Sequence, residues 1–138
     1  MKNKGFTFIE MLVVVVIIGV LASVGVANFK VANQKARDGR RQGDLQQIRA
    51  ALELYRTDVN LYPTSTFPAV GGDLTYGGTT YMSNRPGDPL DPTYTYYYSS
   101  NGARYTLCAY LEIGGIAGSC STNSCTGAAC NYIITNPL

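Results

Sequence analysis

Residues 4–10, Lys4-Gly5-Phe6-Thr7-Phe8-Ile9-Glu10, open a nearly unbroken apolar run that extends to Ala27. No charged residue occurs from Met11 to Ala27, and Glu10 is the only ionisable side chain between Lys4 and Lys30. A helix of about 20 apolar residues can cross the bilayer core, which is roughly 30 Å thick. A carboxylate at mid-bilayer depth costs about 2.5 kcal/mol or more. Glu10 therefore needs a functional reason.

The apolar run has two ordinary interpretations. A secretory signal peptide would be cut behind small residues, and Gly25-Val26-Ala27 offers these at the right spacing. Against this, the run is longer than the usual 7–15 residues, and Glu10 lies at its front edge. A plain single-pass anchor accounts for the length of the run but not for Glu10.

The motif also resembles the class III prepilin signal of the type IV pilin and pseudopilin family. The matching residues are Lys-Gly, then Phe-Thr-Phe-Ile-Glu, then Met-Leu-Val-Val-Val-Val-Ile-Ile-Gly-Val-Leu-Ala. The resemblance implies that a prepilin peptidase cuts between Gly5 and Phe6 and N-methylates Phe6. Residues 1–5 would then be a leader peptide. Residues 6–29 would remain as a hydrophobic transmembrane helix that later forms the filament core.

Glu10 acquires a role in this interpretation. Cleavage would leave an ammonium group on Phe6, one helical turn before Glu10. Staggered parallel helices could bring the Glu10 carboxylate of one subunit to the amine of another. Such a pair attracts strongly in a medium of low dielectric constant, whereas either charge alone is penalised there. We therefore expect Glu10 to set the register of assembly. The alternative is that Glu10 reaches the cytoplasmic headgroups.

Residues 30–57 are predicted to continue the helix as an amphipathic stem. Four apolar residues recur at steps of three and four and so share one helix face. These are Leu45, Ile48, Leu52 and Tyr55. We expect this face to pack on the antiparallel sheet of a small globular head, residues 58–138. The expected fold class is α+β and type IV pilin-like, with a disulfide-bonded C-terminal region.

The head is predicted to begin with a long connection and to continue with strands. Residues 61–91 are rich in Pro and Gly, which indicates a surface connection with short strands at most. Residues 93–99 and 103–113 are rich in Tyr and Thr and predict two strands. Ser100-Asn101-Gly102 predicts the hairpin turn between them. Residues 131–135 predict a third strand, and three or four strands are expected in all.

All four cysteines lie in the last 31 residues: Cys108, Cys120, Cys125 and Cys130. An even number in a region rich in Gly, Ser and Thr, in a chain without His, favours two disulfides over a zinc site. The three connectivities cannot be ranked from the sequence. Disulfides imply an oxidising environment outside the cytoplasm for the head. The resemblance adds that pilins often have such a region, whereas major pseudopilins usually lack one.

Charge is unevenly distributed around a net value of +2. Residues 30–56 carry seven basic and three acidic side chains, and residues 57–138 carry two basic and five acidic ones. Counting Lys and Arg would place the head inside the cell, in conflict with the cysteines and the resemblance. We favour a head outside. For the basic cluster at 30–41 we expect a solvated or lipid-contacting face first and pairing with a neighbouring subunit second. Nucleic acid is a weakly supported third partner, because no DNA-binding motif accompanies the cluster.

The resemblance also implies a metal in one branch of the family. Pseudopilins of type II secretion hold calcium near the positions of Asp88 and Asp91. Two aspartates three residues apart do not provide the six to eight oxygens that calcium takes. We therefore expect a turn here first, and no cofactor other than this weak calcium candidate.

The chain is predicted to be a structural subunit and not an enzyme. It has no His for acid–base chemistry, no Cys–His pair and no phosphate-binding glycine loop. The first functional expectation is a pilin that polymerises into a helical type IV pilus-like filament for adhesion, motility or DNA uptake. The alternatives are a major pseudopilin of type II secretion and a non-polymerising, membrane-anchored binding module. The expected partners are further copies of the chain, a prepilin peptidase, an assembly platform with its ATPase and, before assembly, the membrane. The expected location is the cytoplasmic membrane and then a cell-surface filament.

Overall fold

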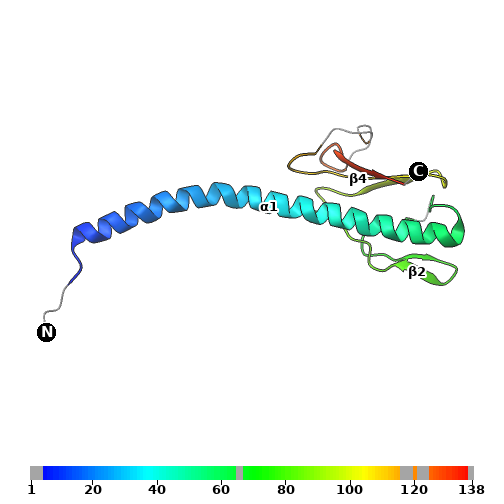
Figure 1. The fold of residues 1–138 in the computed structure, drawn as a ribbon, viewed down its shortest axis with the longest axis horizontal. Coiled ribbons are helices and arrows are strands. Elements are labelled where there is room, and N and C mark those ends of the chain that lie inside the picture. The colour runs from blue at the N-terminus through cyan, green and yellow to red at the C-terminus, as the bar shows by residue number, and fades with distance from the viewer. Residues whose placement is uncertain (1–4, 65–66, 116–119, 121–124, 137–138) are drawn as a thin grey trace. The chain divides into compact units, whose positions relative to one another are not determined.

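A computed structural model describes residues 5–64, 67–115, 120 and 125–136. The chain divides into two compact units, Met1–Lys35 and Ala36–Leu138, which are treated separately below as the N-terminal unit and the head unit. One helix, α1 (Phe8–Val59), contributes residues to both units (Figure 1). It ends two residues beyond the predicted stem of residues 30–57 and before Pro63, whose ring cannot continue a helix.

The N-terminal unit consists of a short non-helical segment and the first part of α1. From Phe6 to Leu21 the large apolar side chains are all about half exposed or more. By length and composition this helix can cross a membrane. The apolar surface thus has no cover from the chain itself in this unit.

In its described residues, the head unit combines the rest of α1 with five strands. A hairpin consists of β1 (Leu74–Tyr76) and β2 (Thr79–Met82), and a separate antiparallel sheet has the order β3 (Tyr97–Ser100), β4 (Tyr105–Ala109) and β5 (Tyr132–Thr135). Within this unit the sheet and the hairpin lie on opposite sides of α1 (Figure 1). The predicted α+β class with a small antiparallel sheet is confirmed.

The core of the head unit is built on one face of α1. Leu45, Ile48 and Leu52 are 0% exposed, and Tyr55 is 6% exposed. They share a cluster with apolar residues of both sheets: Leu74, Met82, Tyr105, Leu107 and Ile134. Full burial of a Leu or Ile side chain stabilises a fold by about 1.5–3 kcal/mol. The helix therefore serves as the common support of the two sheets.

Turn chemistry fixes both hairpins. Gly77 and Gly78 join β1 to β2 with φ values of 58° and 85°, which only glycine adopts freely. Between β3 and β4, the Asn101 side-chain oxygen accepts hydrogen bonds from the peptide N–H groups of Ala103 and Arg104, at 3.1 and 2.8 Å. This is the predicted turn. The β1–β2 hairpin lies in the stretch expected to hold short strands at most.

Two strands are shorter than predicted, for identifiable reasons. Residues 93–96 do not belong to β3, because the Thr93 N–H donates to the Leu90 carbonyl within a turn. Residues 110–113 do not belong to β4, because side chains form hydrogen bonds with the peptide groups of residues 111–113. Asn131 binds both the N–H and the C=O of Leu111. Asp38 on α1 accepts the N–H groups of Glu112 and Ile113, at 2.9 and 2.8 Å.

Candidate functional site

The expected processing site lies just before the helix. Gly5 and Phe6 are non-helical and exposed, and no described neighbour would meet a Cβ added at Gly5. The peptide bond between them is therefore presented in an open segment, where a protease could reach it.

Glu10 belongs to a capping box at the start of α1. Its Oε2 accepts hydrogen bonds from the Thr7 N–H and the Thr7 hydroxyl, both at 2.8 Å. In return the Glu10 N–H donates to Thr7 Oγ1 at 3.4 Å. This reciprocal pattern between the N-cap residue and the third helical residue satisfies peptide donors that the helix cannot pair itself. Sequence analysis missed it, although Thr7-Phe8-Ile9-Glu10 has the Thr-x-x-Glu signature.

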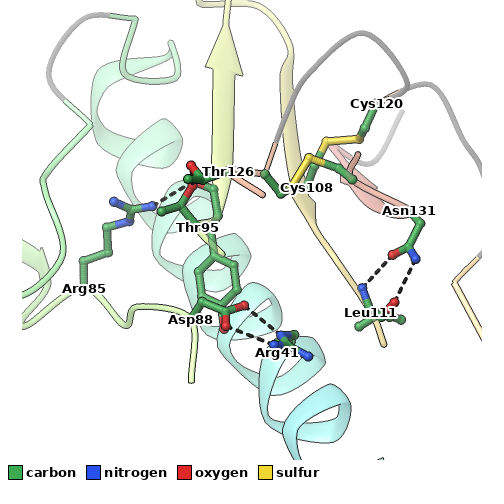
Figure 2. Close-up of a disulfide and its surroundings, with 12 residues drawn as sticks. Arg41, Arg85, Asp88, Thr95, Cys108, Leu111, Cys120, Thr126 and Asn131 are labelled. Atoms are coloured by element: carbon green, nitrogen blue, oxygen red, sulfur yellow. Dashed lines mark hydrogen bonds and ion pairs between the residues drawn. A yellow bond between two sulfur atoms is a disulfide. The ribbon is translucent and has the colours of Figure 1, made fainter. Parts of the chain in front are cut away.

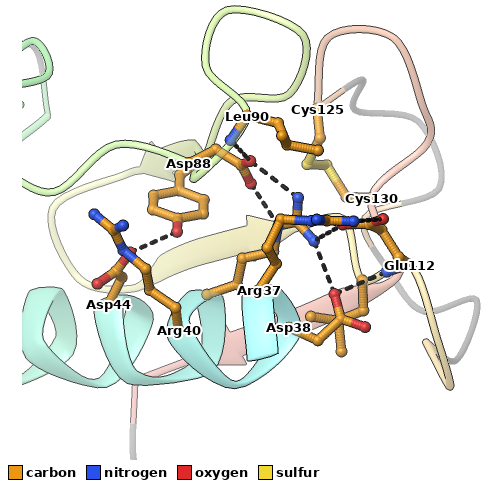
Figure 3. A network of polar contacts seen from close by, with 12 residues as sticks. Arg37, Asp38, Arg40, Asp44, Asp88, Leu90, Glu112, Cys125 and Cys130 are labelled. Carbon is orange, nitrogen blue, oxygen red and sulfur yellow. Dashed lines mark hydrogen bonds and ion pairs between the residues drawn. A yellow bond between two sulfur atoms is a disulfide. The ribbon is translucent and has the colours of Figure 1, made fainter. Parts of the chain in front are cut away.

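A second polar site is a buried cluster of two arginines and three carboxylates in the head unit. Arg41 is 0% exposed and binds Asp88 through two contacts, Nε–Oδ2 at 2.7 Å and Nη2–Oδ1 at 3.0 Å (Figure 2). Its Nη1 binds Asp38 at 2.8 Å and Glu112 at 2.9 Å. Arg37 binds both oxygens of Glu112, at 2.7 and 2.6 Å (Figure 3). The cluster joins α1 to the loop after β2 and to the segment after β4.

The electrostatics of the cluster follow from these contacts. Hydrogen bonds from Arg37, reinforced by Arg41, lower the pKa of Glu112 to about 2 despite its partial burial. Burial alone would lower the pKa of Arg41, but hydrogen bonds to Asp88, Glu112 and Asp38 raise it overall. Glu112 and the two arginines are therefore charged at neutral pH.

The expectation for the basic cluster at 30–41 is wrong for two of its members. Arg37 and Arg41 bind carboxylates of the same chain instead of facing solvent, lipid or another subunit. Arg40 lies 3.9 Å from Asp44, which leaves Lys30 and Lys35 as the basic residues of this stretch without an ion pair among the described side chains. Arg37 and Arg41, two of the basic residues that conflicted with a head outside the cell, thus form ion pairs within the head unit.

The sequence held a signal for Arg41. Asp38 and Arg41 precede Leu45, Ile48, Leu52 and Tyr55 at steps of three and four residues, so they extend the same helix face. A charged residue in register with a core stripe must be paired when it is buried. The acidic residues that face it, Asp88 and Glu112, could not be identified without the tertiary contacts.

The two calcium candidates, Asp88 and Asp91, make different contacts. Both oxygens of Asp88 are bound to Arg41, and its Oδ1 also accepts the Leu90 N–H at 2.8 Å. Asp91 is exposed and lies in a turn, where its own N–H donates to the Asp88 carbonyl at 3.0 Å. The described residues include no group of three acidic, His or Cys side chains placed to hold a metal ion.

The cysteines form two disulfides, as predicted. Cys108 on β4 pairs with Cys120, and Cys125 pairs with Cys130. The structure thereby selects one of the three connectivities left open. The Thr95 N–H donates to the Cys125 carbonyl at 3.0 Å, which ties the small disulfide loop to the segment before β3.

Tyrosine hydroxyls of the head unit bind acidic residues of α1. Tyr96 donates to Asp44 at 2.7 Å, and both Tyr62 and Tyr105 contact Glu53, at 3.0 and 3.3 Å. Burial is the main cause of the raised pKa of Tyr96 and of Tyr105. These tyrosines serve packing within the head unit.

An apolar helix behind a processing motif, followed by a helix-supported sheet with disulfides, defines a type IV pilin-like subunit. Comparison with known proteins agrees. The model of the prokaryotic N-terminal methylation motif matches residues 1–26, and that of type II secretion system (T2SS) protein G matches residues 28–123. The chain belongs to the type II secretion system protein G family.

Individual relatives have the same description, "Type II secretion system core protein G". The Escherichia coli (strain K12) protein is 32% identical over 117 residues, which cover 77% of this chain and 79% of the relative. The Vibrio cholerae protein is 34% identical over 103 residues, covering 69% and 70%. The Klebsiella pneumoniae protein is 41% identical over 64 residues, covering 46% of each chain. No solved structure matches this chain.

These matches confirm the pilin and pseudopilin family. Between its branches they favour the alternative stated from the sequence, the pseudopilin, over the surface pilus that was expected first. The disulfides are the feature that favours the pilus branch. The methylation motif and the apolar helix fit membrane anchoring before assembly.

Proposed function

We propose that this chain is the major-type pseudopilin of a type II secretion machinery, a structural subunit that polymerises into a helical filament. The observation that carries the proposal is the uncovered apolar surface of α1 behind a methylation motif. Such a surface must be covered by lipid or by other protein. A membrane would cover it before assembly, and the helices of neighbouring subunits would cover it in the filament.

Processing would prepare the chain for this change of surroundings. Cleavage after Gly5 by a prepilin peptidase would create the N-terminal amine of Phe6, which would then be methylated. The cytoplasmic membrane would hold the subunit with its head unit outside, and an assembly platform with its ATPase would extract it. Repetition of one head-to-tail contact does not close on itself and so gives a helical polymer.

Glu10 would have two partners in succession. In the single chain the carboxylate is satisfied by Thr7. During assembly we expect it to meet the Phe6 amine of a neighbouring subunit, which would fix the axial offset between helices. A carboxylate that found no partner in the filament core would be strongly penalised.

The test combines processing and assembly in one strain. Mass spectrometry of the purified mature protein should find methylated Phe6 at the N-terminus. Glu10→Leu should still insert and be processed, but filaments recovered by shearing should fall to background. Val14→Leu on the same helix is the matched control and should assemble normally. Normal filament yield from Glu10→Leu, or a mature protein that begins at Met1 or Asn28, would refute the proposal.

A surface pilus for adhesion, motility or DNA uptake is the second candidate. It is favoured by one observation, the disulfide-bonded C-terminal region. Deletion of the gene separates the two: loss of protein export with normal motility and DNA uptake supports the pseudopilin, and the reverse supports the pilus.

A further inference from the structure

The loop between β2 and β3 is fastened by two guanidinium groups from inside the head unit. Arg41 binds Asp88 in this loop from the helix side. Arg85, which is 8% exposed, donates to the carbonyls of Pro68 and Tyr96, at 3.1 and 3.4 Å. Its guanidinium carbon also lies 4.7 Å from the centre of the Phe67 ring. Carboxylates and carbonyls are the groups that a bound calcium ion would otherwise bring together.

The residues present do not fit a calcium ion at Asp88. Calcium takes six to eight oxygen ligands, whereas both Asp88 oxygens are held by the Arg41 fork. An ion bound to these oxygens would lie next to a guanidinium, and two positive charges at such short range repel strongly. The neighbouring Asp91 lies in a turn, and the described residues contain no group of three acidic, His or Cys side chains placed to hold a metal ion. Asp38 and Glu112, the other carboxylates of the cluster, are themselves bound to Arg41.

The geometry of the cluster is that of a central cation with three carboxylates around it. Asp38 comes from α1, Asp88 from the loop after β2, and Glu112 from the segment after β4. Each of the three carboxylates also accepts hydrogen bonds from other donors, which offset its negative charge. Asp38 accepts two peptide N–H groups, Asp88 accepts one, and Glu112 is also bound by Arg37.

We propose that the Arg41 guanidinium takes the place of a bound metal ion in the head unit, so that this head unit folds and remains stable without calcium. The fixed planar fork of arginine suits the role, because it presents five N–H donors that can reach several carboxylates at once. The proposal concerns the head unit alone and does not depend on filament assembly.

The first test compares the full-length protein, in detergent micelles, with millimolar calcium chloride and with excess EGTA. Near-ultraviolet circular dichroism of the tyrosines reports the unfolding of the head unit. The expected result is the same Tm in both conditions and no calcium binding in titration calorimetry. A Tm that falls on EGTA treatment, or saturable calcium binding at micromolar concentration, overturns the proposal.

The second test removes the internal cation. Arg41→Gln should lower the Tm by about 10 °C or more, because the buried Asp38 and Asp88 lose their guanidinium partner and Glu112 keeps only Arg37. The matched control is Arg40→Gln, since Arg40 is the adjacent residue and is exposed; its Tm should change by only a few degrees. A Tm for Arg41→Gln equal to that of the unchanged protein overturns the proposal.

If Arg41→Gln does not fold, Arg41→Lys provides another test of the role of the guanidinium. Lysine keeps the positive charge but loses the fork, so a folded protein with a clearly lowered Tm is expected, again insensitive to EGTA. The opposite result is that calcium raises the Tm of Arg41→Lys to that of the unchanged protein. Such a rise would show that a metal ion can replace the guanidinium, and it would count against the proposal.

Discussion

Arg41 and Asp88, 47 positions apart in the chain, meet through two parallel contacts of 2.7 and 3.0 Å, and neither side chain is more than 1% exposed. A buried ion pair contributes little compared with well-packed apolar residues, but the loss of one partner leaves the other charge uncompensated. The pair is therefore a point where a single substitution has a large effect on the head unit.

Asp88→Asn should lower the free energy of unfolding by about 3 kcal/mol, because it removes the charge that Arg41 faces while keeping the shape of the side chain. Chemical denaturation of the full-length protein in micelles measures this. Asp91→Asn, three residues further on in the exposed turn, is the control and should change stability by less than about 0.5 kcal/mol. Equal effects of the two substitutions would contradict the assigned role of the pair.

Stability should fall in acid because of Glu112. The pKa of this carboxyl is lowered to about 2 in the folded protein, against an ordinary value of about 4.3 when unfolded. A lowered pKa stabilises the fold above the unfolded value, and the contribution is lost as pH falls towards 2. We expect about 2 kcal/mol to disappear between pH 5 and pH 2. Glu112→Gln should flatten this part of the stability profile; an unchanged profile would refute the assignment.

Alkaline titration should reveal the buried tyrosines. Burial raises the pKa of Tyr98 to about 12, and the pKa values of Tyr96 and Tyr105 are raised in the same direction. A raised pKa stabilises the fold below the unfolded value of about 10, and this contribution is lost as pH rises past 12. Phenolate absorbance should therefore show a late phase that accompanies unfolding. The late phase should shrink in Tyr98→Phe, and an unaltered amplitude would argue against burial as its cause.

The two disulfides should contribute unequally. Cys108 and Cys120 are 12 positions apart and Cys125 and Cys130 are 5 apart. Loop-closure entropy predicts losses of about 3 and about 2 kcal/mol on removal. The double replacements Cys108→Ser with Cys120→Ser, and Cys125→Ser with Cys130→Ser, should be compared by thermal unfolding. A larger loss from the short loop would show that its contacts with Thr95 outweigh chain entropy.

The capping box gives a prediction for the first turn of α1. Thr7→Ala removes the side-chain acceptor and should weaken this turn by about 1 kcal/mol, whereas Thr7→Ser keeps the hydroxyl and should have little effect. Amide hydrogen exchange at Ile9 and Glu10 in micelles measures the local change. Identical exchange in the two variants would mean that the first turn does not depend on Thr7.

Much of the fold could be predicted because it is recorded in local patterns. The apolar run, the stripe from Leu45 to Tyr55 and the Asn101-Gly102 turn each depend on neighbours in sequence. The extent of β4 could not be predicted in this way. Residues 110–113 have the composition of a strand, but Asn131 and Asp38 take the peptide groups that a longer strand would use.

The polar sites were harder to predict than the apolar core. Arg41 was placed in a solvated basic run, because composition gives the number of charges but not their partners. Its position on the core stripe was the available signal. The pairing with Asp88 and Glu112 depends on contacts across 47 and 71 positions, which no periodicity records. The capping partner of Glu10, by contrast, lies three residues away and could have been found.

The Asp38 carboxylate accepts the N–H groups of Glu112 and Ile113, and this affects where the sequence can change in length. A side chain on α1 marks where the central strand stops, and a segment that begins after residue 113 connects it to the third strand, β5, which begins at Tyr132. Insertions or deletions in that segment, up to its return at Asn131, would leave the strand register untouched. A lineage could therefore diversify this segment while its scaffold stayed the same.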